Sequence, residues 1–287
     1  MNKLNLISYF GGKYPHLKWL TDQFPKGDFH FVDIMCGSAN VALNVNYPLI
    51  TINDLNEDVI NLFEVLRTRE EELTRAIYFT PFSRQELYRI IDNYYSTADA
   101  VERARRFFVR SQLGYGANGS QNNHKGAGFE WGIQKSQFYR VDNWNAKLRR
   151  FAEIAHRLRG MQIEHRSALD LFAKVDRKDC IVYFDPPYEL STRKSKKRYT
   201  HEVENDFHEA LAVLAPKAKC YLAISGYESP MYNKLFKAMH KIKGPPTKST
   251  VSKSARQECL WTNYIPEEVN FRVMGQMSLL DQIEINA

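Results

Sequence analysis

The sequence has few cysteines and no long apolar run, and each absence excludes a class of protein. Only four cysteines occur among 287 residues, with no Cys-x-x-Cys pair and no Cys/His cluster. Neither a zinc site nor a disulfide framework is indicated, so we expect no metal and buried, reduced thiols in a cytoplasmic protein. No apolar stretch approaches the ~18 residues of a membrane span. The N-terminus lacks a basic segment followed by an apolar one, so the sequence does not predict secretion.

Acidic residues are also in short supply. The chain carries 40 Lys and Arg against 33 Asp and Glu, a formal net charge of +7. Between Arg84 and Gly160 there are 14 cations and 7 acids, an excess of +7 that equals that of the whole chain. A localised basic region is typical of a protein that binds a phosphate backbone. A solvated basic surface without a partner would have the same composition.

An apolar strand followed by two prolines is the most informative stretch. Residues 180–184, Cys-Ile-Val-Tyr-Phe, predict a buried central strand, and Asp185, Pro186, Pro187 and Tyr188 follow directly. The prolines end the strand, so a carboxylate and a ring lie at its carboxyl end, where ligands bind in open α/β sheets. Asp185 and the Pro186 carbonyl could accept hydrogen bonds from an exocyclic amino group, such as N6 of adenine, while Tyr188 stacks on the base. The alternative is an ordinary exit turn in which Asp185 caps a helix.

A strand, a small-residue turn and a second strand near the N-terminus suit an adenosine-containing cofactor. A strand, a tight turn and then a helix are expected within residues 29–43, and the second strand, residues 49–52, leads to Asp54. Asp54 lies 17 positions after Gly37, close to the ~20 expected for an acid that binds ribose hydroxyls. No Gly-x-Gly-x-x-Gly occurs, so a dinucleotide fits less well. Asp54 could instead cap a helix over residues 57–67.

Residues 68–160 interrupt the alternation of strands and helices. We expect helices over 83–95, 98–113 and 144–158, around a segment rich in Gly, Asn and aromatic residues. Amide side chains and cations in flexible loops suit base edges and phosphates, so an inserted DNA-reading module is predicted, with an ordered surface insertion as the alternative. The side chains expected to contact DNA are Arg110, Asn118, Lys125, Lys135 and Arg140 here, and Arg193, Lys194, Lys196, Lys197 and Arg198 beside the proposed base pocket.

Taken in order, these motifs resemble the Dam-like, α-group family of DNA N6-adenine methyltransferases, which use S-adenosyl-L-methionine. The resemblance covers roughly residues 5 to 265. The segments that carry it are Tyr9-Phe10-Gly11-Gly12-Lys13, Phe31-x-Asp33-x-x-Cys36-Gly37-Ser38, Asn53-Asp54, Asp185-Pro186-Pro187-Tyr188 and Asn263-Tyr264. The family's first motif commonly has glycine where Ser38 and Ala39 stand. GATC specificity is not implied, because residues 129–132 depart from the family's GATC-reading segment.

The resemblance implies an α/β fold with a seven-stranded Rossmann-like methyltransferase sheet, parallel except for the last strand, and an inserted, mostly helical target-recognition domain. The catalytic domain would comprise residues 1–67 and 161–287, and the insertion residues 68–160. Asp185, Pro186, Pro187 and Tyr188 would bind a flipped adenine. Lys13 would lie near the methionine carboxylate of the cofactor, and Asp54 at its ribose. The expected cofactor contacts are Tyr9, Phe10, Lys13, Asp33, Cys36, Gly37, Ser38, Asp54, Leu55, Ser167, Ala168 and Asp185.

The implied activity is site-specific methylation of adenine N6 in double-stranded DNA, by a cytoplasmic, nucleoid-associated monomer or weak dimer, within a restriction–modification system or alone. Methylation of cytosine N4, or of adenine in RNA, uses the same motif geometry. A protein-glutamine methyltransferase would prefer Asn in place of Asp185, and a silent DNA-binding module would not need an intact motif. Residues Gln276–Leu280 resemble a sliding-clamp docking peptide, although packing of their apolar side chains is the simpler explanation.

Overall fold

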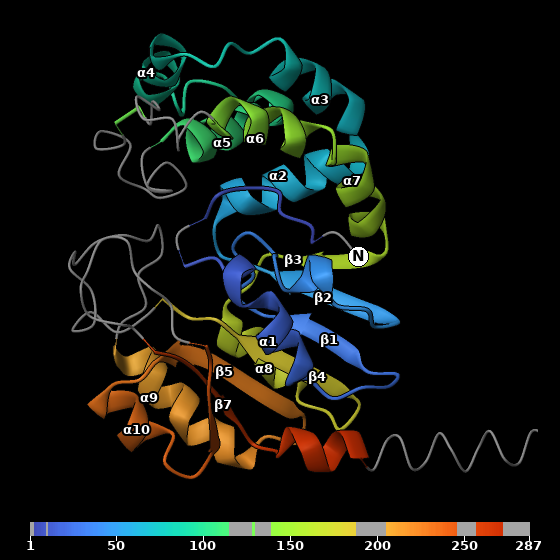
Figure 1. Cartoon of the computed structure of the whole chain (residues 1–287), viewed down its shortest axis with the longest axis vertical. Helices are drawn as coiled ribbons and strands as arrows, with labels where there is room; N and C mark the ends of the chain where they lie inside the picture. Colours follow the sequence, from blue (N-terminus) through green and yellow to red (C-terminus); the bar gives the residue numbers. More distant parts are fainter. Residues whose placement is uncertain are drawn as a thin grey trace, which may run out of the picture.

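The computed structural model describes residues 3–9, 11–114, 128–129, 139–187, 205–245 and 257–271. Within these ranges one seven-stranded sheet has the order β3-β2-β1-β4-β5-β7-β6 (Figure 1). Its strands are β1 (His30–Asp33), β2 (Leu49–Asn53), β3 (Met161–Glu164), β4 (Cys180–Phe184), β5 (Tyr221–Tyr227), β6 (His240–Lys243) and β7 (Glu258–Thr262). Strands β1 to β5 pair in parallel, whereas β7 is antiparallel to both β5 and β6. The expected methyltransferase sheet, parallel except for its last strand, is confirmed.

Alternation along the central strands supplies two separate cores. Ile181 and Tyr183 of β4 join the core on one face, while Val182 and Phe184 join the core on the other. All five residues of β4 are buried, as the apolar run predicted. The first face is covered by α1 (Leu17–Asp22), α2 (Glu57–Thr68) and α7 (Phe151–Arg159), and the second by α8 (Ala168–Val175), α9 (Asn205–Leu214) and α10 (Pro230–Leu235) (Figure 1).

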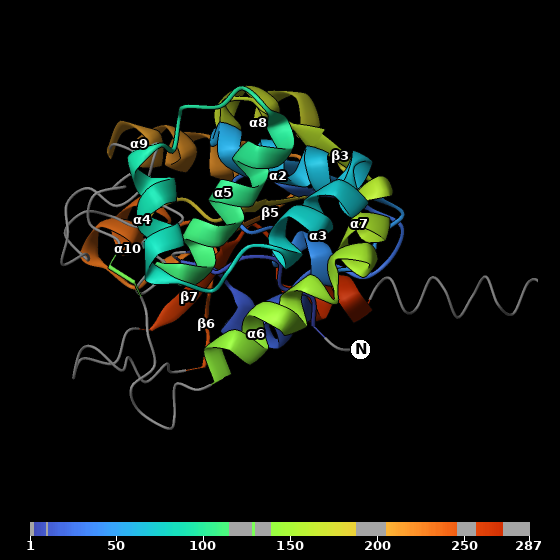
Figure 2. The same ribbon diagram turned by 90° about the horizontal axis from the view of Figure 1, so that it is seen from above.

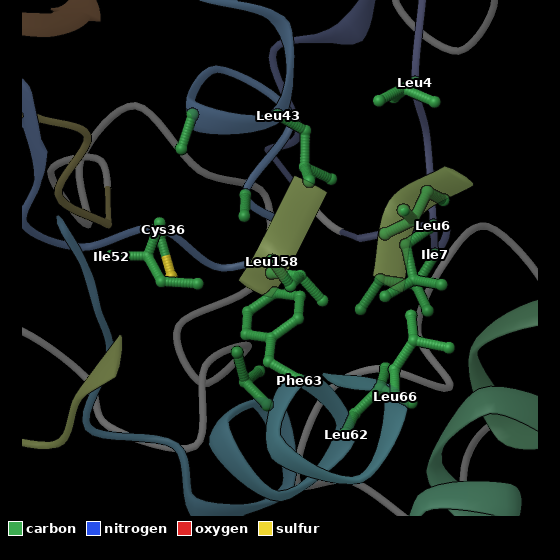
Figure 3. Packing of buried hydrophobic residues seen from close by; sticks show 14 of the residues in the cluster. Leu4, Leu6, Ile7, Cys36, Leu43, Ile52, Leu62, Phe63, Leu66 and Leu158 are labelled. Carbon is green, nitrogen blue, oxygen red and sulfur yellow. The ribbon is translucent and has the colours of Figure 1, made fainter. Parts of the chain in front are cut away.

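Helix α2 anchors the first core. Its apolar residues recur at helical spacing, so that Leu62, Phe63 and Leu66 project from α2 into the cluster that also contains Leu158 of α7 and Leu6 and Ile7 of the N-terminal segment (Figure 3). Leu62, Phe63, Leu66 and Leu158 are all 0% exposed. Replacing Phe63 by alanine would leave a cavity at this seam and cost about 3–5 kcal/mol. The position of α2 matters to the site because the helix begins just after Asp54.

Four helices form a further layer outside α2, between β2 and β3 in the sequence (Figures 1 and 2). They are α3 (Glu70–Tyr78), α4 (Arg84–Asp92), α5 (Ala100–Leu113) and α6 (Tyr139–Leu148). Helix α5 contacts α2, α3 and α4, so it is the axis of this insertion. Side-chain caps start two of the helices, because Ser83 accepts from Glu86 N at 3.1 Å and Asp99 from Glu102 N at 2.7 Å. The helical insertion expected from the sequence is therefore present.

The single helix expected over 144–158 is instead two helices, α6 and α7, separated at Arg149 and Arg150. The break lets two aromatic residues reach the same partner, since Trp144 and Phe151 both pack edgewise on Phe108 of α5, at 5.3 and 5.2 Å between ring centroids. An unbroken helix would be favoured by propensity alone, so tertiary packing overrides it here.

Two other elements differ from the expectations. Strand β6 was not anticipated, because its sequence, His-Lys-Ile-Lys, offers one apolar side chain and lies at the edge of the sheet. After Gly37 the chain makes a short 3₁₀ turn, Ala42–Asn44, rather than a helix. All four cysteines are buried and free, as expected. Within the described ranges, every helix is too short or too polar to cross a bilayer.

Candidate active site

Asp185 lies at the centre of the sheet, directly past the carboxyl end of β4. The neighbouring strand β1 ends at the same level, with Asp33 paired to Tyr183. The chain leaves β1 toward β2 on one side and reaches β4 on the other, so this is the switch point at which ligands bind in open α/β sheets. Pro186 and Pro187 are buried, whereas the Asp185 side chain is 20% exposed. The Asp185 carboxylate is therefore partly accessible at the switch point.

Lys13 joins the N-terminal glycine turn to this carboxylate. Its Nζ lies 2.5 Å from Asp185 Oδ1 and 3.7 Å from Glu258 Oε1, and it donates to the Gly11 carbonyl at 3.2 Å. Both Lys13 and Glu258 are nearly inaccessible, with side chains 4% and 3% exposed. Charges buried to this degree stabilise a fold only when paired. Strands β4 and β7 and the glycine turn therefore share one ionic cluster, in which Glu258 was not foreseen.

Ser225 holds the same carboxylate from the other side. Its hydroxyl donates to Asp185 Oδ1 at 2.8 Å and accepts from the Tyr183 hydroxyl at 3.0 Å. Burial raises the pKa of Tyr183 well above its usual value, so the phenol stays protonated and continues to donate. Sequence reasoning missed Ser225, although the pairing of β4 with β5 carried the signal. Phe184 pairs with Ile224, so the next residue on each strand is Asp185 and Ser225.

The turn after β1 brings backbone close to the site. Gly37 has φ +49° and Ala39 has φ +51°, a left-handed conformation in which glycine is favoured. A Cβ on Gly37 would lie 2.8 Å from the Tyr9 ring, and one on Gly12 would lie 3.1 Å from the Tyr9 carbonyl. The turn is therefore a tight cradle between two segments, with no room for added side chains. Ala39 adopts the left-handed conformation although it is not glycine.

Asp54 ties the second strand to this turn. Its Oδ2 accepts from Gly37 N at 2.8 Å, and its Oδ1 accepts from Asn56 N at 2.8 Å. The cap of α2 is Asn56, whose side chain accepts from Asp58 N, so Asp54 is not the helix cap that was weighed as an alternative. Asp54 therefore holds the turn after β1 and the start of α2 in fixed positions.

Asn53 fixes three turns at once and was not foreseen as a site residue. It is 1% exposed, and its amide nitrogen donates to the carbonyls of Ile34 and Arg166 at 2.9 and 3.0 Å. Its side-chain oxygen accepts from Arg166 N at 2.8 Å, while its backbone carbonyl accepts from Cys36 N at 2.9 Å. The loops after β1, β2 and β3 are locked together through this residue.

Two buried side-chain oxygen atoms near the Gly37 turn lack a hydrogen-bond donor, which indicates a ligand that carries donor groups. Among the described residues, no donor reaches the buried Asp33 Oδ1 or the buried Asn40 Oδ1. Desolvation and the nearby Asp185 charge raise the pKa of Asp33 from 3.8 to about 8. A cationic or hydroxyl-bearing ligand would supply what these atoms lack. An adenosine-containing cofactor with an ammonium group and ribose hydroxyls fits this set of acceptors.

The remaining predicted cofactor residues vary in placement. Cys36 and Ser38 are buried in the cradle, at 8% and 3% exposure, and burial raises the pKa of the Cys36 thiol. Leu55 is 40% exposed beside Asp54. Ser167 and the buried Ala168 begin α8, after β3. Phe10 and Tyr188 lie outside the described residues.

The basic insertion is more internally neutralised than its composition suggested. On α5, Arg105 and Arg106 bond to Glu102 at 2.6 and 2.7 Å, and Arg103 lies 3.2 Å from Asp58. Arg110 is 2% exposed, with its guanidinium 3.8 Å from the centre of the Tyr94 ring. Because the Arg110 guanidinium is buried against Tyr94, it packs inside the insertion and is not available to a DNA phosphate in this structure. This corrects the expectation that Arg110 contacts DNA.

The other expected DNA contacts have side chains outside the described part of the chain. Arg140 lies in α6, but its side chain is outside the described part of the chain. Also outside it are Asn118, Lys125, Lys135, Arg193, Lys194, Lys196, Lys197 and Arg198, together with the tail segment Gln276–Leu280.

Comparisons with known proteins agree with this geometry. A family model described as D12 class N6 adenine-specific DNA methyltransferase matches residues 9–250. A DNA adenine methylase of Salmonella typhi is 29% identical over 187 residues, which cover 63% of this chain and 64% of the relative. A DNA adenine methylase of Vibrio cholerae serotype O1 is 26% identical over 217 residues, covering 74% and 75%.

A third relative comes from a different setting. The type II methyltransferase M.FokI of Planomicrobium okeanokoites is 27% identical over 197 residues, which cover 65% of this chain and 29% of that protein. The match with the DNA adenine methylase of Salmonella typhi spans 64% of the length of that methylase, just under two thirds. The family model, in contrast, runs from the glycine turn past β5 and includes β1 and β4, the two strands at the switch point. The chain belongs to the D12 class of N6 adenine-specific DNA methyltransferases.

Proposed function

We propose that this protein transfers a methyl group from S-adenosyl-L-methionine to N6 of an adenine flipped out of double-stranded DNA. The observation that carries the proposal is the position of Asp185. Its carboxylate is held by Lys13 at 2.5 Å and Ser225 at 2.8 Å, and stays 20% exposed at the switch point beside the Gly37 cradle. An acceptor held in a fixed position at the end of the sheet is what methylation of an amino group requires.

The cradle residues would hold the cofactor. Asp33 and Asn40 offer their unsatisfied oxygens to donors, Asp54 offers acceptor sites to ribose hydroxyls, and Tyr9 packs over the turn at Gly37. Ser167 and Ala168 would border the adenine, with Leu55, Cys36 and Ser38 completing the wall. When bound, S-adenosyl-L-methionine supplies a methyl group already activated by its sulfonium.

Asp185 would do two things to the target base. Its carboxylate and the Pro186 carbonyl accept from the two N–H bonds of N6, which orients the nitrogen toward the methyl donor. The negative charge would also stabilise the positive charge that develops on nitrogen as the new C–N bond forms and the bond from the methyl group to sulfur breaks, which leaves a neutral thioether. Nitrogen then loses one of its two protons. Tyr188 is proposed to stack on the flipped base. This stacking would offset part of the few kcal/mol that it costs to unstack the base from the duplex.

The insertion, residues 68–160, is proposed to read the DNA, with the catalytic part comprising residues 1–67 and 161–287. The cations at 193–198 would bind phosphates near the pocket, and Asn118, Lys125, Lys135 and Arg140 would contact DNA from the insertion.

The relative named as a type II methyltransferase makes a restriction–modification system one setting for the activity. We further propose action as a monomer or weak dimer in the cytoplasm. A pull-down with purified sliding clamp, comparing wild type with Gln276→Ala, tests the tail.

Identification of the methylated nucleoside tests this function. DNA is incubated with the protein and isotopically labelled S-adenosyl-L-methionine, digested to nucleosides, and analysed by mass spectrometry. Labelled N6-methyl-2′-deoxyadenosine is the expected product. A labelled N4-methylcytosine, label only in an RNA substrate, or no label in either nucleic acid would contradict the proposal.

A further inference from the structure

Glu258, the first residue of β7, places a second carboxylate beside Lys13. Its Oε1 lies 3.7 Å from Lys13 Nζ, whereas Asp185 Oδ1 lies 2.5 Å from the same nitrogen. Lys13 is therefore shared by two acids, of which Glu258 is 3% exposed and Asp185 is 20% exposed. An acid is costly to bury unless its charge is paired, so the position of Glu258 beside Lys13 calls for a reason.

Strand register fixes the position of Glu258. In the antiparallel pairing of β5 with β7, Tyr227 lies opposite Glu258 and Ser225 lies opposite Leu260. Side chains that lie opposite one another, and those two positions apart on one strand, share a face of the sheet. Ser225 and Glu258 therefore belong to the same face. The carboxylate that contacts Lys13 and the hydroxyl that contacts Asp185 are both held by regular strands, which position side chains more precisely than loops do.

Glu258 also decides the net charge around the target base. Lys13 and Asp185 alone would form a neutral pair, and an ionised Glu258 restores one net negative charge to the ionic cluster. Two neighbouring groups do not alter this balance. Burial raises the pKa of Asp33 to about 8 and lowers the pKa of His16, so both are mainly uncharged at neutral pH.

The balance matters because the reacting nitrogen gains positive charge as the methyl group is transferred. A fixed negative charge beside that nitrogen stabilises the transition state more than the ground state. Lys13 orients Asp185 but opposes its charge at a distance of 2.5 Å. A second carboxylate on the same ammonium group offsets this opposition without taking a place at the substrate.

We propose that Glu258 is a positioning residue for methyl transfer. Its carboxylate holds the Lys13 ammonium group and offsets its charge, so that Asp185 is oriented by Lys13 and still acts on N6 as a negative charge. This role rests on the proposed function, since it concerns the same transfer to adenine N6.

Two pairs of side chains of equal shape test the role of the charge. Wild type is compared with Glu258→Gln, and Glu258→Asp with Glu258→Asn, because the members of each pair differ in charge and hardly in shape. The single-turnover rate of methyl transfer is measured at saturating S-adenosyl-L-methionine and duplex DNA. The affinities for both ligands and the thermal unfolding temperature are measured on the same preparations.

Asp179→Asn is the control for loss of one negative charge. Asp179 immediately precedes β4 and its side chain is 65% exposed. It is six residues from Asp185 in the sequence, which is about 20 Å along an extended strand. Its removal should leave the transfer rate unchanged.

The charged member of each pair should transfer methyl groups about 10-fold faster than the neutral member, a smaller effect than the about 100–1,000-fold of a group that contacts the developing charge directly. Affinities for cofactor and DNA should be equal within each pair. A purely structural Glu258 would change the unfolding temperature without separating the rates. Should Glu258→Gln fail to fold, Glu258→Asp and Glu258→Asn decide.

Equal transfer rates within the pairs, with normal transfer by wild type, would overturn the role of Glu258 alone. A loss confined to cofactor or DNA affinity would also overturn it, because the charge would then act on binding and not on transfer. Wild type that methylates no adenine would overturn the proposed function and the role of Glu258 with it.

Discussion

Asp33 makes the stability of this fold depend on pH in a way that a single substitution can reveal. The carboxyl is 2% exposed, accepts one long hydrogen bond from Ala42 N at 3.4 Å, and has its other oxygen unsatisfied among the described residues. Burial, reinforced by the Asp185 charge, raises its pKa from 3.8 to about 8. We predict that Asp33→Asn removes a pH-dependent destabilisation from the cofactor-free protein.

The direction follows from proton binding. Between pH 3.8 and about 8, the folded chain binds this proton more tightly than the unfolded chain does, so its stability falls as the pH rises through that window. Each pH unit within the window costs about 1.4 kcal/mol, which amounts to about 3 kcal/mol between pH 5 and pH 7. That is a large fraction of the 5–15 kcal/mol (about 0.05–0.15 kcal/mol per residue) of a typical domain.

Urea unfolding of wild type and Asp33→Asn from pH 5 to pH 8 measures the effect. The free energy of unfolding of the variant, relative to wild type, should rise by about 3 kcal/mol from pH 5 to pH 7 and level off above pH 8. An amide nitrogen left without an acceptor would cost about 1–3 kcal/mol at every pH, so the slope carries the test. A difference that stays constant with pH would refute the raised pKa.

Three further substitutions probe the site. Ser225→Ala removes the donor at 2.8 Å from Asp185 and should lower kcat by about 10–100-fold, with cofactor affinity unchanged in calorimetry; an unchanged kcat would contradict the positioning role. Gly37→Ala forces a Cβ to within 2.8 Å of the Tyr9 ring at a positive φ and should weaken cofactor binding at least about 10-fold, whereas Gly160→Ala, whose Cβ meets nothing closer than 3.6 Å, should not. Asp54→Asn should weaken cofactor binding by about 10–100-fold, as loss of a charged hydrogen bond does; equal calorimetric affinities would remove Asp54 from the cofactor site.

Much of this fold could be predicted because its informative segments are local. The run at 180–184, ended by two prolines, predicts a buried strand with a carboxylate at its end, and β4 has that form. Helix caps at Ser83 and Asp99 likewise mark α4 and α5 in the sequence. Each of these features depends on residues within one turn or one strand of each other.

The rest depends on contacts that no local pattern encodes. The break between α6 and α7 arises because Trp144 and Phe151 converge on Phe108, a residue more than 30 positions away. The pairing of Lys13 with Asp185 spans 172 positions, and the bond from Ser225 needs the register of β4 with β5. Charge counting also misplaced Arg110, because composition does not distinguish an arginine that is buried over Tyr94 from one that faces solvent.

The rate of methyl transfer by Asp185→Ala in a single turnover measures the role of the sheet-end carboxylate most directly. The assay uses saturating S-adenosyl-L-methionine and duplex DNA, with cofactor affinity and thermal unfolding measured on the same preparation. We expect the variant to fold, to bind the cofactor with near wild-type affinity, and to transfer methyl groups to adenine N6 at least about 1,000-fold more slowly, the scale of a lost electrostatic contact to a developing charge. Transfer within a few-fold of wild type would show that Asp185 does not act on the base.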